Sequence, residues 1–297
     1  MSRSVEVFQV DAFTNRAFTG NPAGVVLGAD VLDSDEMQAI ARELNNGDTT
    51  FVCRPQSADH DIAVRFFTPG REATFVGHAT LAAHAVLQSR EPRALRRQRG
   101  RSGVVEVQAL EDGRLCIRQP PAPLGREPEA RELDDVLDAV GLSRPRLDPQ
   151  CPARIVGGSS TRLLVGLQSA LDLAALTPRM DALIALSSRL GAQGYFFYTR
   201  HTAAAGCDTE SRMFCPAIGI PEDPVSGNAH AMLGHYLFAY GLLDVSSGRA
   251  SFSGAQGQSL GRPGQVDVDV DVGADGNVNA VGIAGNAVII FQARISL

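Results

Sequence analysis

The chain contains no lysine, because all 27 of its basic residues are arginine. A lysine amine forms the Schiff base with pyridoxal phosphate or a carbonyl substrate, and a lysine also completes the phosphate-binding P-loop. The sequence therefore excludes both mechanism classes.

Cysteine is scarce and scattered. The five cysteines form no Cys-x-x-Cys pair and stand at positions 53, 116, 151, 207 and 215. A disulfide framework or a zinc ribbon needs paired, regularly spaced cysteines. His230 and His235 are five apart on one expected helix and face different directions, and His84 is expected to be a core residue. We therefore predict reduced cysteines, no metal site and no cofactor.

Long apolar runs are also missing. No stretch approaches the roughly 20 apolar residues of a membrane-spanning helix, and the N-terminus runs into a strand-like pattern without a signal peptide. We predict a cytoplasmic protein with no membrane partner. The net charge of -6 argues against nucleic acid as a partner. We interpret the arginine run over residues 90–101 as a solvated connector.

Two segments of the chain resemble each other. The first runs from Arg65-Phe66-Phe67-Thr68-Pro69 to Gly77-His78-Ala79, and the second from Arg212-Met213-Phe214-Cys215-Pro216 to Gly227-Asn228-Ala229. In each, an aromatic strand ends at a proline, and a glycine then opens a helix that is apolar on nearly every face, as buried helices are. The N-terminus of such a helix suits a small carboxylate. We predict one anion-binding site between two similar domains.

Strand patterns outnumber helical ones. Strands are predicted over 5–12, 23–27, 49–54, 61–68, 104–107, 114–118, 154–156, 162–166, 195–199, 211–214, 265–272 and 287–296, and surface helices over 34–43, 132–140 and 180–191. This pattern predicts an α+β fold with a curved sheet around a central helix in each half.

The domain boundary is predicted at the proline-rich segment 119–124 (Gln119-Pro120-Pro121-Ala122-Pro123-Leu124). Prolines there forbid a continued central strand or helix. We predict an N-terminal domain over 1–118 and a C-terminal domain over 125–286. A last strand within 287–297 could complete the first domain.

Three titratable residues are candidates for proton transfer. His78 stands in the first turn of the first buried helix, Asp223 shortly before the second, and Asp48 follows Asn-Gly. Each also has a non-catalytic interpretation. His78 could be a structural hydrogen-bond donor at the start of a helix, Asp223 a turn or cap residue, and Asp48 a turn residue. We place His78 and Asp223 at equivalent points of the repeat, which favours the catalytic interpretation.

Five motifs resemble the phenazine-biosynthesis PhzF isomerase family, in the right order over essentially the full length. They are Asp11-Ala12-Phe13 with Phe18 to Val25, Asn45 to Phe51, Phe67-Thr68-Pro69, Gly77-His78-Ala79-Thr80, and Glu222 to Ala229. The resemblance implies two pseudo-symmetric domains, each a β-barrel around a central helix, as in diaminopimelate epimerase. It also implies a homodimer, a small-molecule carboxylate substrate and no cofactor.

The resemblance also assigns roles to residues. In that family a glutamate shuttles a proton between carbons of a cyclic amino acid, and Asp48 stands where that glutamate is expected. The shorter side chain withdraws the carboxylate by about 1.5 Å, which leaves the exact reaction open. Asp48, His78 and Asp223 are then the expected catalytic residues. The expected substrate-binding residues are Asn21, Gly77, Ala79, Ser226, Gly227 and Asn228.

Three functions stay open from the sequence. The first is a cofactor-independent isomerase or epimerase acting on a small amino or hydroxy acid. The second is a lyase or hydrolase on the same scaffold, and the third is a catalytically idle protein that binds small carboxylates.

Overall fold

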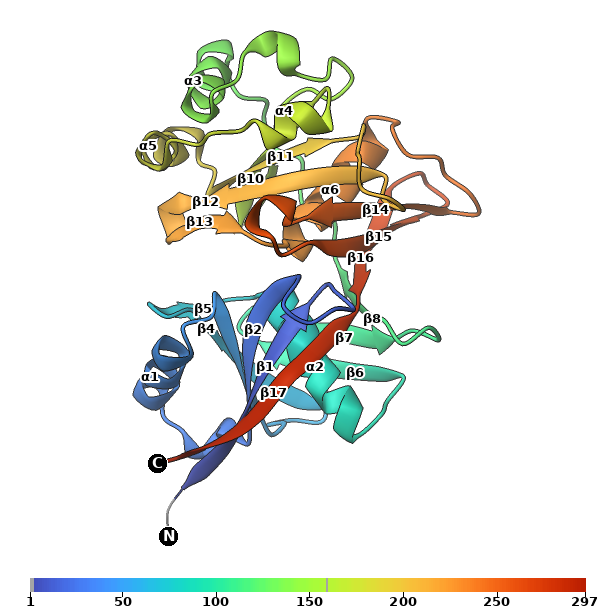
Figure 1. The fold of residues 1–297 in the computed structure, drawn as a ribbon. Helices are drawn as coiled ribbons and strands as arrows, with labels where there is room; N and C mark the ends of the chain where they lie inside the picture. The colour runs from blue at the N-terminus through green and yellow to red at the C-terminus, as the bar shows by residue number, and fades with distance from the viewer. Residues whose placement is uncertain (1–2, 159) are drawn as a thin grey trace. The chain divides into compact units, whose positions relative to one another are not determined.

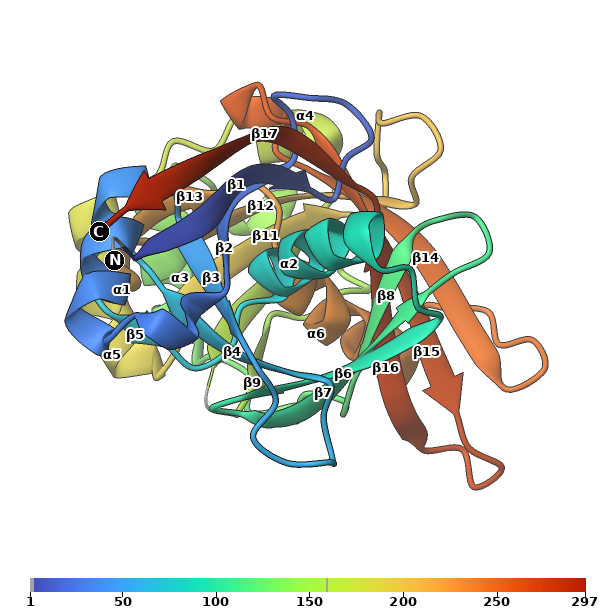
Figure 2. The ribbon, with the colours of Figure 1, turned by 90° about the horizontal axis from the view of Figure 1, so that it is seen from below.

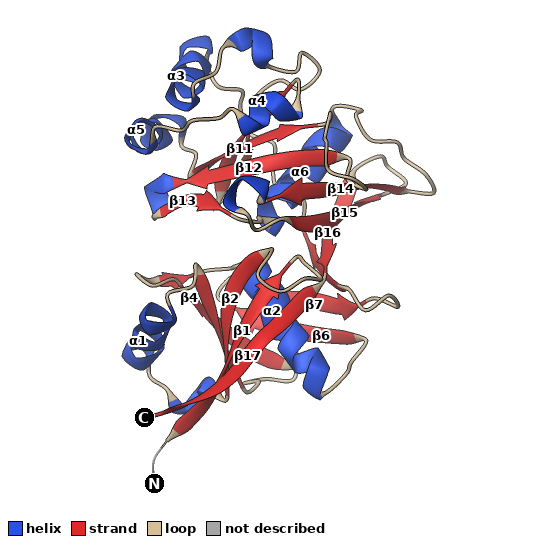
Figure 3. Cartoon of the chain, in the orientation of Figure 1, coloured by secondary structure: helices blue, strands red, loops and turns tan. Residues whose placement is uncertain are grey.

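A computed structural model describes residues 3–158 and 160–297 and divides into two compact units (Figure 1). Unit 1 comprises Met1–Gln119 and Ile283–Leu297, and unit 2 comprises Pro120–Gly282. Both units consist mainly of strands with few helices (Figure 3), so the fold is α+β. Among the described residues, no helix is long and apolar enough to cross a membrane.

Unit 1 is a mixed sheet. Its strands are β1 (Ser4–Ala12), β2 (Asn21–Leu27), β3 (Asp48–Cys53), β4 (Ile62–Phe67), β5 (Glu72–Ala73), β6 (Leu95–Gly100), β7 (Gly103–Ala109), β8 (Leu115–Gln119) and β17 (Ala287–Ser296). Antiparallel pairs join β17 to β1, β1 to β2, β3 to β4, β6 to β7 and β7 to β8, while β2–β3 and β4–β6 are parallel. The last strand of the chain therefore belongs to the sheet of unit 1.

The described part of unit 1 contains two α-helices. Helix α1 (Ser34–Leu44) begins at a capping box, in which Asp33 accepts from the Glu36 N–H and Glu36 accepts from the Asp33 N–H. Helix α2 (Gly77–Arg90) is buried along most of its length, as its lack of a polar face predicts. It contacts β1, β2, β3, β8 and β17, and Figure 2 shows it beside β1 and β17.

Unit 2 repeats this plan with additional helices. Its strands are β9 (Arg154–Gly157), β10 (Thr161–Leu167), β11 (Gly194–Thr199), β12 (Thr209–Cys215), β13 (Ile220–Asp223), β14 (Arg249–Gln256) and β15 (Gly264–Val272), and β16 (Val278–Gly285) continues past the unit boundary. Its α-helices are α3 (Ala130–Val140), α4 (Ala170–Ala174), α5 (Met180–Leu190) and the largely buried α6 (Gly227–Ala239). Short 3-10 helices complete the chain at Ala29–Val31, Arg144–Arg146, Pro216–Ile218 and Gln258–Leu260.

The strand pairings of the two units follow the same order. In unit 2, β9–β10 is antiparallel, β10–β11 parallel, β11–β12 antiparallel, β12–β14 parallel and β14–β15 antiparallel. The same alternation runs from β1 to β7 in unit 1. Helix α5 precedes β11 as α1 precedes β3, and α6 precedes β14 as α2 precedes β6. The internal repeat predicted from two segments therefore extends through most of each unit.

The arginine run is not a connector, because part of it is a strand, but five of its six arginine side chains are solvated, at 41–62% exposed. Half of it forms β6, which lies between β4 and β7, and Arg96 is only 4% exposed. The other arginines of the run form ion pairs, namely Arg90 with Glu6, Arg93 with Glu91 and Asp61, Arg97 with Asp61, Arg99 with Asp59 and Arg101 with Glu72. Because each charge has an acidic partner, the run is not an open positive patch.

Candidate functional site

Asp48 is the first residue of β3, and its side chain is buried. It lies opposite Ala23 of the parallel strand β2. Helix α1 ends at Asn45 in the left-handed conformation, and the chain then turns into β3. The side-chain amides of Gln9 and Asn46 hold this turn through two mutual hydrogen bonds of 3.1 and 2.8 Å. The alternative of a turn residue is therefore wrong for Asp48.

His78 lies beside Asp48. Its side chain is 9% exposed, and its Nε2 atom is 3.7 Å from Asp48 Oδ2. Within the described part of the chain, this buried Nε2 has no hydrogen-bond partner. Burial lowers the pKa of His78 from 6.5 to about 4, so the ring is neutral at pH 7. His78 therefore places a neutral imidazole next to a carboxylate, with no hydrogen bond to Nε2 among the described residues.

The first turn of α2 supplies backbone donors at the same place. The first intrahelical bond runs from the Thr80 N–H to the Val76 carbonyl, at 2.9 Å, and Val76 provides no side-chain cap. The N–H groups of residues 77–79 precede that bond and carry the partial positive charge of the helix N-terminus. Thr50 of β3 donates to the Ala79 carbonyl at 2.9 Å and ties this turn to the strand of Asp48.

Asn21 lies at the same end of the sheet. It opens β2 opposite Ala12, two residues before the partner of Asp48, and it is 3% exposed. Unit 1 therefore brings together four of the predicted site residues, which are Asn21, Asp48, Gly77 and His78, with Ala79 following in the helix.

The remaining predicted residues lie together in unit 2, at the start of α6. Asp223 ends β13 opposite Met213 and is partly exposed. Ser226 is the N-cap of α6, and its hydroxyl accepts from the Ala229 N–H at 3.4 Å. Gly227 and Asn228 form the first turn after it. Gln256 of β14 also bonds to this turn, and no sequence pattern predicted that contribution because β14 itself was missed.

His78 and Asp223 are not equivalent in the repeat, so that sequence-based prediction is wrong. Ala73 pairs with Phe66 as Asp223 pairs with Met213, which makes Ala73 the counterpart of Asp223. The counterpart of His78 is Asn228, the second residue of α6. The sequence-based prediction failed because Asp223 lies four residues before the glycine that opens α6, whereas His78 directly follows the glycine that opens α2.

The counterpart of Asp48 is Gly194. Both residues open the third strand of their unit and stand in the first pair of a parallel ladder. The unit that carries Asp48 and His78 therefore has both titratable groups of this constellation, while unit 2 has a glycine and an asparagine at the same points.

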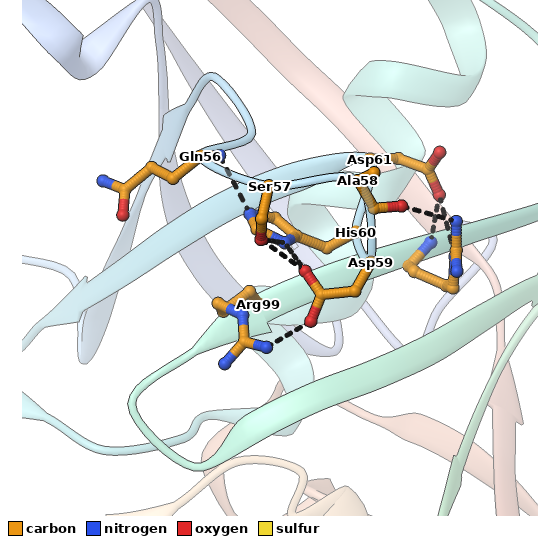
Figure 4. Close-up of polar contacts among 8 residues, drawn as sticks. Gln56, Ser57, Ala58, Asp59, His60, Asp61 and Arg99 are labelled. Carbon is orange, nitrogen blue, oxygen red and sulfur yellow. Dashed lines mark hydrogen bonds and ion pairs between the residues drawn. The ribbon is translucent and has the colours of Figure 1, made fainter.

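A serine, a histidine and an aspartate also meet in the loop between β3 and β4 (Figure 4). His60 Nδ1 lies 2.7 Å from Asp59 Oδ1 and 3.2 Å from Ser57 Oγ, while Nε2 accepts from the Gln56 N–H. In a nucleophilic triad, serine and aspartate bond to different ring nitrogens. Here both oxygens face the same nitrogen, so the cluster closes a loop and does not activate Ser57.

The thiols are unsuited to proton transfer. Burial raises the pKa of Cys53 and Cys151 to about 11 and that of Cys215 to about 12, so these groups stay protonated at neutral pH. Among the described residues, no cluster of His, Cys, Asp and Glu could hold a metal ion.

The comparisons with known proteins agree on one family. An uncharacterised isomerase of Clostridium acetobutylicum is 35% identical over 303 residues, and the match covers 100% of both chains. The trans-2,3-dihydro-3-hydroxyanthranilate isomerase of Pseudomonas aeruginosa is 32% identical over 292 residues, covering 97% of this chain and 98% of the relative.

Solved structures extend the similarity to the fold. A PhzF-family phenazine biosynthesis protein of Bacillus anthracis matches with a TM-score of 0.88 and 27% identity, over 99% of both chains. A hydroxyproline epimerase of Agrobacterium vitis shares the fold at a TM-score of 0.64 and 11% identity, over 99% of this chain and 93% of the other. Residues 10–293 match the family described as phenazine biosynthesis-like protein, and the chain therefore belongs to that family, the PhzF family of isomerases.

Proposed function

We propose that the protein is an isomerase that moves a proton next to the carboxylate of a small amino or hydroxy acid, with Asp48 as the base. The observation that carries the proposal is the pairing of buried Asp48 with neutral His78, at 3.7 Å between Oδ2 and Nε2. A carboxylate removes the proton, and a neutral imidazole beside it can orient a substrate amine or hydroxyl, or return the proton to a different carbon.

The repeat offers no second copy of the Asp48–His78 pair in unit 2. A racemase with two bases needs a proton acceptor on each face of one carbon. Here the counterparts of Asp48 and His78 are Gly194 and Asn228, which cannot accept a proton from carbon. We infer that Asp48 removes the proton, and that His78 or Asp223 orients the substrate or returns the proton to another carbon. Asp223 adds a carboxylate at a position that has no acidic counterpart, since Ala73 stands there in unit 1.

The substrate carboxylate is bound by backbone N–H groups at helix N-termini. Gly77, His78 and Ala79 supply such groups at the start of α2, and Gly227 and Asn228 offer a second set at the start of α6. When the neighbouring carbon loses its proton, negative charge spreads into the carboxylate, and these donors stabilise it. Asn21 contributes an amide at the same end of the sheet as Asp48.

Solvent deuterium exchange tests the proposal. The purified protein is incubated in heavy water with cyclic and acyclic amino and hydroxy acids, including trans-2,3-dihydro-3-hydroxyanthranilate, and proton NMR follows the carbons near the carboxylate. We expect deuterium uptake and a new isomer from at least one compound. Asp48→Asn should reduce the rate by at least about 100-fold, with ligand binding retained.

Asp59→Asn is the matched control, because Asp59 is a carboxylate of the same unit that pairs with His60 and Arg99. It should leave exchange unchanged. Exchange that survives in Asp48→Asn would remove Asp48 from the role of base. Binding of several compounds without exchange of any would support an idle carboxylate-binding protein instead.

A further inference from the structure

The turn before α6 is fixed by one buried side chain. Gln256, at the end of β14, is 1% exposed. Its Nε2 donates to the Asp223 carbonyl at 2.6 Å, and its Oε1 accepts from the Ser226 N–H at 3.0 Å. One amide therefore bridges both ends of the Asp223–Ser226 turn.

Two neighbours hold the same turn from other sides. His230 Nδ1 lies 2.8 Å from the Ser226 carbonyl, to which it donates, and burial keeps this ring neutral by lowering its pKa to about 4. Gly257 lies against the Pro224 carbonyl, where a Cβ would come within 2.8 Å, and its φ of 94° also favours glycine. The turn thus has little freedom to shift relative to β14.

Unit 1 lacks these contacts at the equivalent places. The register of β6 on β4 makes Gly100 the counterpart of Gln256, and Thr80 is the counterpart of His230. Val76, which caps α2, makes no side-chain cap bond. The turn in unit 1 carries Ala73 where unit 2 carries Asp223. The additional bonds therefore occur in the copy whose turn bears a carboxylate.

We propose that Gln256 is a positioning residue, which sets the place of Asp223 and of the first N–H groups of α6 for the reaction. The inference rests on the proposed function, in which Asp223 acts on the substrate. It adds a residue that none of the sequence motifs contains. The physical basis is that a misplacement of about 1 Å in a catalytic constellation can cost about 100-fold in rate.

Two substitutions separate the bonds that Gln256 makes. Gln256→Met has a similar length and removes both hydrogen bonds. Gln256→Glu keeps the acceptor for the Ser226 N–H but places a carboxylate against the Asp223 carbonyl. When that glutamate is protonated, its O–H can donate to the Asp223 carbonyl again, and burial favours the protonated form.

The expected result is a loss in kcat with a smaller change in KM. Gln256→Met should lower kcat by about 10- to 100-fold, measured well below the melting temperature of the variant. The kcat of Gln256→Glu relative to wild type should recover as the pH falls from about 8 to about 6. A folded Gln256→Met with wild-type kcat would overturn the proposal, and this variant decides the question if Gln256→Glu does not fold.

Gln98→Met is the matched control. Gln98 is also 1% exposed and also bonds to a central helix, through Thr80 Oγ1 at 3.1 Å and His84 Nε2 at 2.9 Å, but these contacts lie beyond the first helical residues. It should lose stability without losing kcat below its melting temperature. If both glutamine variants lost kcat equally, Gln256 would have a general structural role only.

Hydrogen exchange provides a readout that needs no substrate. Mass spectrometry of wild type and Gln256→Met should show amides of the segment 223–229 exchanging at least about 10-fold faster in the variant, with residues 77–90 unchanged. Unchanged exchange in the turn would overturn the positioning role whether or not turnover is seen. Faster exchange in a protein that turns over no compound would leave Gln256 as the residue that orders the turn and would refute the isomerase proposal alone.

Discussion

Arg65 and Glu72 form a two-point ion pair, with Nε–Oε1 at 2.8 Å and Nη2–Oε2 at 3.0 Å. The second copy of the repeat reproduces it with Arg212 and Glu222, at 2.9 and 3.0 Å. Each guanidinium also lies 5.0 Å from the ring centroid of the phenylalanine two residues later. In both copies the pair joins the strand before the central helix to the short strand that leads into it.

The second pair should be the stronger of the two. Arg212 and Glu222 have side chains that are 12% and 13% exposed, against 32% and 18% for Arg65 and Glu72. Truncating one partner of a buried pair costs about 3–5 kcal/mol, while exposed pairs contribute about 0–1 kcal/mol. Double-mutant cycles in urea, with methionine for arginine and glutamine for glutamate, should give the larger coupling energy for the unit 2 pair. Equal coupling energies would contradict this ranking.

Gly254 should be intolerant of a side chain for a reason specific to unit 2. A Cβ at this position would lie 2.4 Å from the His230 ring, whereas the counterpart position in unit 1 holds the large Gln98 beside the small Thr80. Gly254→Ala should cost about 1–3 kcal/mol through overpacking. His230→Thr in the same chain should recover part of that loss, as measured by chemical denaturation. Additive effects of the two changes would show that the ring is not the source of the clash.

Stability should fall with acid between pH 6.5 and pH 4. Burial lowers the pKa of His84 from 6.5 to about 4, so the unfolded chain binds a proton that the folded chain does not. The contribution of this group to the free energy of unfolding is fully present above the pKa of the unfolded state. It is lost as the pH falls towards the pKa of the folded state, and it amounts to about 3 kcal/mol for one such group. His84→Gln should flatten this part of the curve of unfolding free energy against pH. The same slope in wild type and variant would contradict the assignment.

The pH dependence of turnover should show no histidine inflection near neutrality. His78 takes up a proton only near its lowered pKa of about 4, so its charge is constant through the neutral range. We expect kcat/KM of wild type and His78→Gln to have the same shape between about pH 5.5 and pH 8, with a lower level in the variant. An inflection near pH 6.5 that disappears in His78→Gln would show that the ring titrates normally.

We propose that β17 contributes to the homodimer that the family resemblance implies. The strand pairs with β1 and carries exposed apolar side chains, with Ile289 37% and Phe291 49% exposed. Long apolar strands with open surface tend to pair with other chains. Light scattering should give a dimer mass for wild type and a monomer mass for Phe291→Glu, with Leu171→Glu, on the exposed face of α4, as the control. A monomeric wild type would refute the proposal.

The regular elements were largely predictable because their signals are local. The alternation of buried and exposed side chains in β1 and β15 and the capping box of α1 each involve residues that are close in the sequence. β6 was missed because its arginines are neutralised by acids far along the chain, such as Asp59 and Asp61 in the loop before β4. β14 was missed because many of its residues are small and give no clear apolar pattern. Part of its burial is due to its contact with α6.

The sequence predicted which residues form the candidate site but not how those residues are arranged. The motif around Asp48 predicted its importance, and the structure adds the buried neighbour His78. The equivalence of His78 with Asp223 failed because Asp223 lies four residues before Gly227, whereas His78 directly follows Gly77, and the pairing of Ala73 with Phe66 confirms Ala73 as the counterpart of Asp223. Gln256 belongs to no sequence motif. Its role depends on hydrogen bonds to the Asp223 carbonyl and the Ser226 N–H, which only the folded structure shows.

The pairing of β17 with β1 has a consequence for synthesis of the protein on the ribosome. Unit 2 is one continuous segment, so it can fold while the rest of the chain is still being translated. Unit 1 is discontinuous, and the strand that follows Asn286 must arrive before β1 gains its outer neighbour. The half that carries Asp48 and His78 therefore receives β17 only after unit 2 has been translated.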